Sequence, residues 1–170
     1  MGPGMVFKAA LTRHFSIVAF GLAQIFIDIE VLWFLSQGEY HHLHRFWHTY
    51  PGATVAAAAA AVFGKPASQW LKRAWNSIAG GFPGTDLTLE TNTSWKASFI
   101  GAVAGSYSHI LLDSLYHSDI KPFFPWSESN RLYGIISPHN VEIICVVLGI
   151  AGFVIFIERE RRRKIKSGNT

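Results

Sequence analysis

Long apolar stretches constrain this chain more than any other feature of its sequence. Four segments approach the roughly 20 residues that an α-helix needs to cross a bilayer, at about residues 15–35, 46–64, 97–117 and 141–157. Hydrophobic residues make up 49% of the chain and charged residues only 15%, against roughly 25% in soluble domains. We therefore predict an all-α fold, a single integral membrane domain built as a bundle of four transmembrane helices.

The four stretches differ in composition. The last one, VEIICVVLGIAGFVIFI, is the most uniformly apolar, and Ser137 with Pro138 just before it is typical of a helix start. The second is rich in alanine, whose small side chain lets helices approach closely. Beyond it, apolar residues at helical spacing in ASQWLKRAWNSI, residues 67–78, predict a short amphipathic helix, either on the membrane surface or as an ordinary connector.

The distribution of basic residues predicts the orientation. With both termini in the cytoplasm, the inside segments hold twelve of the fifteen Lys and Arg residues, and the outside segments hold Arg45, Lys121 and Arg131. Half of the twelve lie in the tail 159–170. A basic tail beside an apolar helix is typical of the cytoplasmic membrane face rather than of nucleic-acid binding. We expect a multi-pass protein in a lipid bilayer, with an uncleaved first helix and no nucleic-acid partner.

Ionisable residues gather at one depth of this predicted bundle. The first and third helices both run outward, and each carries acidic residues or histidines near its outer end. The loop between the first two helices delivers further histidines to the same side. The gathered residues are Asp28, Glu30, His44, His48, His109, Asp113 and His117.

Charged side chains at membrane depth are costly and mark functional sites. A mixed set of imidazoles and carboxylates suits a divalent metal, with zinc the first choice and Mn²⁺ or Fe²⁺ the others. Glu30 is the candidate general base, acting on a metal-bound water, or else an additional ligand. The single Cys145 excludes a cysteine-based metal site. The expected ligands are first Asp28, His48, His109 and Asp113, and then His44 and His117.

Other functions stay open at this point. The polar residues could be interhelical hydrogen-bonding groups of a structural membrane protein. A proton or ion transporter would need polar residues across the full membrane depth, whereas these stop in the outer half. A haem-binding electron carrier would use two histidines and leave the two aspartates unexplained. The aromatic run KPFFPWSESN at 121–130 is either an interfacial belt or the border of a substrate entrance.

Three short motifs resemble a known family. SHILLD at 108–113, followed by KPFFPW, is similar to the S-H-x-L-x-D stretch of the LexA-regulated, membrane-bound, metal-dependent hydrolases of bacterial inner membranes. IFIDIEVLW resembles that family's P-D-I-D element, with Asp28 and Glu30 at the acidic positions. HRFWHTYPGA resembles its H-R-G-x-T-H-S element, with His44 and His48 at the histidine positions although one residue closer together.

The motifs occur in the family's order over residues 15–126, so the chain resembles a divergent member. The resemblance implies a metal-dependent hydrolase of the inner membrane. From the predicted outer face of the site we expect a lipid-borne or phosphate-containing ester as substrate. The sequence does not specify an oligomeric state.

Overall fold

The computed structural model of the protein describes residues 2–41, 43–80 and 89–166. These residues form helices and loops and contain no strand, as predicted for an all-α fold. The elements, in chain order, are α1 (Gly2–Leu11), the 3₁₀ turn η1 (Thr12–His14), α2 (Ile17–Ser36), α3 (Tyr50–Ala79), α4 (Trp95–Tyr116) and α5 (Pro138–Lys166).

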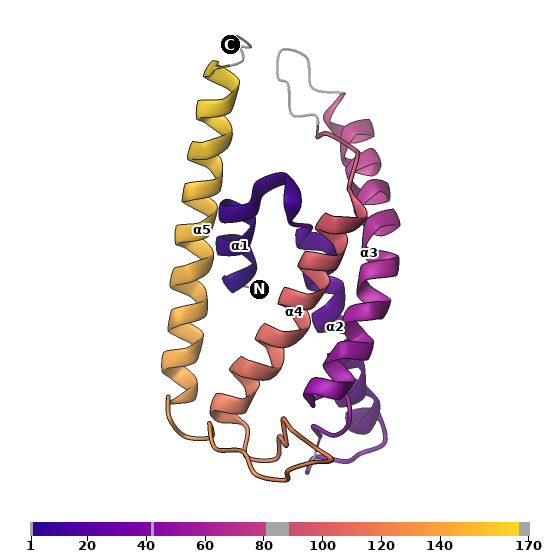
Figure 1. The fold of residues 1–170 in the computed structure, drawn as a ribbon, viewed down its shortest axis with the longest axis vertical. Coiled ribbons are helices and arrows are strands. Elements are labelled where there is room, and N and C mark those ends of the chain that lie inside the picture. Colours follow the sequence, from indigo (N-terminus) through magenta and orange to yellow (C-terminus); the bar gives the residue numbers. More distant parts are fainter. Residues whose placement is uncertain (1, 42, 81–88, 167–170) are drawn as a thin grey trace.

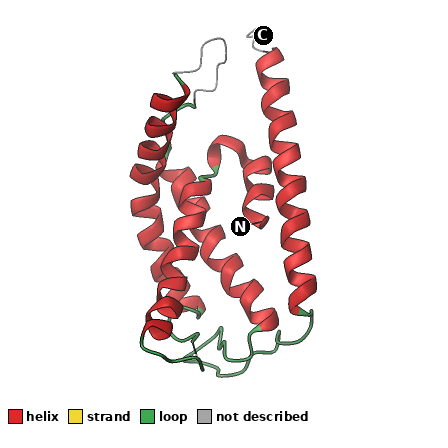
Figure 2. Cartoon of the chain, turned by 180° about the vertical axis from the view of Figure 1, so that it is seen from behind, coloured by secondary structure: helices red, strands yellow, loops and turns green. Residues whose placement is uncertain are grey.

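The helices form two groups, as Figure 1 shows. α2, α3 and α4 pack against one another, while α1 lies mainly against α5. The connections from α2 to α3 and from α4 to α5 meet at the bottom of Figure 1 and again in the view from behind in Figure 2. We call this the loop end. The C-terminal end of α5 lies at the opposite end of the molecule, so the loop end gathers the segments that the sequence predicted to be outside.

Two of the described helices are long and apolar enough to cross a membrane, α2 and the part of α5 from Pro138 to Arg163. The prediction of four spans is therefore too high by this criterion. α3 has 30 residues and α4 has 22, so both are long enough. Their composition makes them less apolar, because α3 is rich in alanine and carries lysines, and α4 carries serines, a histidine and an aspartate.

Two predicted helix boundaries change in the structure. α3 begins at Tyr50 rather than near residue 46, because Thr49 caps it by accepting the Gly52 backbone N–H at 3.1 Å. It then continues to Ala79, so the separate amphipathic helix expected at 67–78 is the last part of α3. α5 begins as predicted at Pro138, and the Ser137 hydroxyl accepts the backbone N–H of Asn140 at 3.3 Å.

Small residues bring α2, α3 and α4 into close contact. A Cβ added to Gly101 would lie 2.2 Å from the backbone oxygen of Ser16, and one added to Gly105 would lie 2.4 Å from that of Phe20. The Ser98 hydroxyl donates to the Ala61 carbonyl at 2.8 Å, linking α4 to α3. Close approach between helices of this kind is typical of membrane bundles. It fixes α2 and α4 side by side, and these two helices carry the acidic residues of the site.

The sequence did not indicate α1. It packs against α5 where α5 carries glycines, and a Cβ on Gly152 would lie 2.5 Å from the backbone of Met5. The Arg159 guanidinium donates to the carbonyl of Ala9 at 2.6 Å and to that of Ala10 at 3.3 Å. Arg159 thereby satisfies carbonyls that the last turn of a helix leaves free. Part of the basic tail thus holds α1 in place.

Candidate metal centre

The site lies at the loop end of the bundle. α2 carries Asp28 and Glu30 in its last three turns, and α4 carries His109 and Asp113 in its last two. His48 belongs to the loop that leads into α3, and its side chain is fully buried. Three separate elements therefore supply the side chains that the sequence predicted to converge.

Four side chains form what we call the inner cluster: Asp28, His48, His109 and Asp113. His109 Nε2 lies 3.1 Å from Asp28 Oδ1 and 3.1 Å from Asp113 Oδ2. His48 Nε2 lies 3.7 Å and 3.9 Å from the same two oxygens. Two imidazole nitrogens from different elements thus face the same pair of carboxylates.

Glu30 lies on the other side of the His48 ring. Its Oε2 is 3.2 Å from His48 Nδ1, and the Glu30 carboxylate also accepts the backbone N–H groups of Arg45 at 2.9 Å and Trp47 at 3.3 Å. A carboxylate that accepts the Nδ1–H of a histidine fixes the tautomer and leaves Nε2 as an acceptor. Glu30 is therefore placed to orient His48 rather than to face the inner cluster itself.

The inner cluster fits a divalent cation. Among the described residues, His48 Nε2 and His109 Nε2 are buried, and neither forms a hydrogen bond of good geometry with the carboxylate oxygens that lie 3.1 to 3.9 Å away. Buried polar atoms normally form such bonds, so two nitrogens that face two carboxylates without them need an explanation. A cation would accept both lone pairs and offset the charges of Asp28 and Asp113.

A second group, the rim cluster, consists of His44, His117 and Asp119. Atoms of these three residues that could bind a metal lie within 4.8 Å of one another. His44 Nδ1 is 2.9 Å from Asp119 Oδ2, and the His44 backbone N–H donates to the same oxygen at 3.2 Å. The centroids of the His44 and His117 rings are 4.2 Å apart. The two loops at this end of the molecule are thus joined through His44.

In the rim cluster, the local electrostatics favour the deprotonated side chains that can bind a metal. Burial and the neighbouring ring of His44 lower the pKa of His117, which favours the neutral imidazole that binds metals. Burial opposes the charged form of Asp119, but hydrogen bonds from His44 outweigh it and hold the pKa of the Asp119 carboxyl below its usual value.

Asp119 was not among the residues predicted from the sequence. It lies in the loop after α4, where an acidic residue ordinarily signals only solvent exposure. Its position two residues after the predicted ligand His117 was the one available signal. Among the other loop histidines, His41 is exposed and takes no part in either cluster, and His42 lies outside the described residues.

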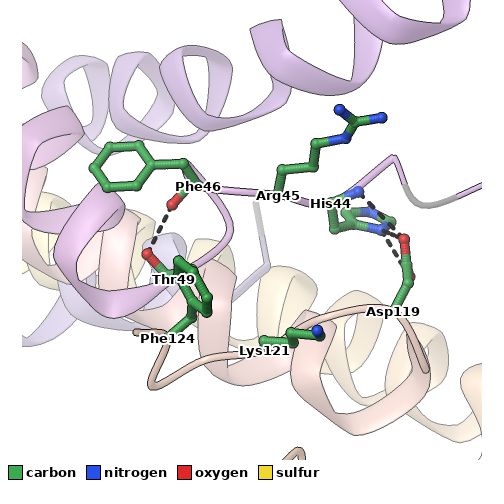
Figure 3. Close-up of a pocket in the computed structure, with 7 residues that line it drawn as sticks. All are labelled: His44, Arg45, Phe46, Thr49, Asp119, Lys121 and Phe124. Carbon is green, nitrogen blue, oxygen red and sulfur yellow. Dashed lines mark hydrogen bonds and ion pairs between the residues drawn. The ribbon is translucent and has the colours of Figure 1, made fainter. Parts of the chain in front are cut away.

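A pocket of about 410 Å³ opens beside the rim cluster. Figure 3 shows His44 and Asp119 facing one another at one side of it, with Phe46, Thr49 and Phe124 at the other. A second, shallower hollow on α2 is lined by Asp28 and by apolar residues, and the Asp28 side chain is 48% exposed there. Asp28 can therefore be reached from the apolar flank of α2.

Comparison with protein families decides the family. A family model described as YdjM inner membrane protein matches residues 5–167, nearly the whole chain. The chain belongs to the YdjM inner membrane protein family. No curated protein and no solved structure matches it.

Family membership and the two apolar helices establish an inner membrane protein with a lipid bilayer around it. This agrees with the inner-membrane family that the three motifs resemble. The matched region includes every residue of the inner and rim clusters.

Proposed function

We propose that this protein is a membrane-embedded, metal-dependent hydrolase that acts on a lipid-borne or phosphate-containing ester at the loop end. The observation that carries the proposal is the pair of buried nitrogens, His48 Nε2 and His109 Nε2, which face Asp28 and Asp113 without hydrogen bonds of good geometry. This arrangement of two imidazoles and two carboxylates is a ligand set for zinc, and it also suits Mn²⁺ or Fe²⁺.

The residues of the inner cluster have separate tasks in this proposal. His48 and His109 offer neutral nitrogens, and Asp28 and Asp113 supply negative charge on either side of them. Glu30 holds His48 in the tautomer that binds. When bound, a divalent cation in such a site supplies Lewis acidity and makes water acidic enough to act near neutral pH.

The proposed membrane topology keeps the predicted four spans. We infer that α3 and α4 cross the bilayer inside the bundle, where alanine, glycine and serine contacts replace contacts with lipid. α2 and α5 then supply the most apolar surface. With the C-terminal end of α5 in the cytoplasm, the loop end faces outward.

Access to the inner cluster favours a substrate with an apolar tail. The hollow around Asp28 is lined by Ile25, Val31 and Leu32, which would border lipid chains. The aromatic residues Phe123 and Trp126 are exposed at the loop end, where the headgroup layer would lie. A lipid ester could therefore approach laterally with its polar group at the cluster.

The test is metal content together with hydrolysis. Protein purified in detergent is analysed for metals by mass spectrometry, beside His109→Ala and the control His41→Ala. It is then assayed with phospholipids, lipid phosphates and soluble esters. We expect bound divalent metal in the wild type and the control, about tenfold less in His109→Ala, and activity that follows the metal.

Two results would overturn the proposal. The first is equal metal content in the wild type and His109→Ala. The second is a folded, metal-loaded protein that hydrolyses none of the phosphoesters and esters in the panel.

A further inference from the structure

The rim cluster has more potential ligands than its own contacts use. Asp119 engages Nδ1 of His44, which leaves Nε2 of His44 available. The His117 ring makes no hydrogen bond to any described side chain or backbone group and instead packs against the rings of His44 and Tyr116. The centroid of the His48 ring lies 4.5 Å from that of His44. Three imidazole rings therefore lie close together. Their nitrogens that do not contact Asp119 or Glu30 have no hydrogen-bond donor among the described residues.

This crowding has a simple electrostatic consequence. Protonated imidazoles at such separations would repel one another. Neutral imidazoles instead have lone pairs that are available to a cation among the rings. A carboxylate behind His44 fixes its tautomer in the same way that Glu30 fixes that of His48. The same carboxylate–histidine arrangement thus occurs twice at the loop end.

Asp113 connects the two clusters. Its Oδ2 faces His109 and His48 in the inner cluster. It also has an oxygen within 4.8 Å of ligand atoms of both His44 and His48. A carboxylate placed between two sets of histidines is suited to bridge two cations.

We propose that the protein binds two divalent cations side by side, the second one held by His44 and His117, with Asp113 bridging the two and Asp119 orienting His44. This inference rests on the proposed inner metal site and extends it. Paired cations of this kind are used by phosphatases and nucleases as well as by aminopeptidases, so among the esters proposed as substrates they favour phosphoesters.

The experiment counts zinc ions. Apo-protein in detergent is titrated with ZnCl₂, freed of excess metal and analysed for zinc per chain. The wild type and the control His41→Ala should retain two ions, and His117→Ala should retain one. Asp113→Asn should lower occupancy at both positions. His117→Gln keeps most of the side-chain size of His117 and serves as the second variant if the alanine variant does not fold.

A spectroscopic readout accompanies the count. Loaded with Mn²⁺, the wild type should give the electron paramagnetic resonance spectrum of two coupled ions, and His117→Gln should give that of an isolated ion. Asp119→Asn should lower the affinity for the second ion by about tenfold and leave the affinity for the first ion unchanged.

The outcomes separate the two proposals. No zinc in the wild type would contradict the proposed function and this inference together. One zinc in the wild type, unchanged in His117→Ala and His117→Gln, would overturn the second site and leave the first. Two zinc ions that persist in both His117 variants would show that the second ion binds elsewhere, and this would also overturn the inference.

Discussion

His48 Nδ1 lies 3.2 Å from Glu30 Oε2, while its Nε2 faces Asp28 and Asp113 from 3.7 and 3.9 Å. The His48 ring therefore lies between the Glu30 carboxylate, which orients it, and the carboxylates of Asp28 and Asp113, which face its Nε2. This relationship assigns Glu30 a positioning role.

The role of Glu30 is tested by Glu30→Gln. The amide cannot replace a carboxylate that accepts the His48 ring N–H and two backbone N–H groups at once. We expect zinc affinity, measured by competition with a chelator, to fall by about 10- to 100-fold, with hydrolysis falling in parallel. Glu142→Gln, on the exposed start of α5, should leave both unchanged. Unchanged zinc affinity with lost hydrolysis would return Glu30 to the general-base role expected from the sequence.

The close approach of α4 to α2 is tested by Gly101→Val. The added side chain would meet the Ser16 backbone oxygen, since a Cβ alone would lie 2.2 Å from it. Overpacking of this kind costs roughly 1–3 kcal/mol of stability, so the thermal midpoint in detergent should fall. Ala58→Val adds bulk at an exposed position of α3 and should leave the midpoint within error of wild type. Equal midpoints for the two variants would contradict the packing described here.

The attachment of α1 to α5 is tested by Arg159→Ala. Removing the guanidinium leaves the carbonyls of Ala9 and Ala10 without their donor. Hydrogen bonds to charged groups contribute about 1.5–3 kcal/mol, so hydrogen exchange across α1 should be faster by about tenfold or more. Within the described parts of the chain, the Arg162 guanidinium pairs with Glu158 and not with α1, so Arg162→Ala should not change exchange in α1. Similar exchange in both variants would show that Arg159 does not hold α1 in place.

Membrane orientation is tested with reporter fusions. Gly38 lies just after α2 at the loop end, and Gly80 lies just after α3 at the opposite end. With twelve of the fifteen basic residues on the cytoplasmic side, a fusion at Gly38 should report the outer side and one at Gly80 the cytoplasm. If both fusions report the same side, α3 does not cross the membrane. If the fusion at Gly38 reports the cytoplasm and that at Gly80 the outer side, the site faces the cytoplasm.

The convergence of the inner cluster could be predicted from the sequence because it depends on the direction in which the helices run. Two apolar helices that run in the same direction bring Asp28 and His109 to one end whatever their exact bounds. The loop contacts could not be predicted in this way. Glu30 accepts backbone N–H groups from an irregular segment, and Asp119 reaches His44 across 75 residues. No periodicity encodes either contact.

α1 and the full length of α3 were missed for a different reason. α1 is short and contains two glycines, and its helix depends on packing against α5 and on Arg159. Propensity alone does not predict such a helix. The predicted end of the second helix near residue 64 was wrong, because α3 continues through Pro66 to Ala79.

X-ray absorption at the zinc edge of the purified, zinc-loaded protein tests the central claim most directly. We expect a first shell of nitrogen and oxygen at about 2.0–2.1 Å, with the outer-shell scattering of imidazole rings. That imidazole signal should fall in His109→Ala and stay intact in His41→Ala. Zinc absent above buffer levels, or a first shell of oxygen alone with no imidazole signal, would contradict a metal centre built on His48 and His109.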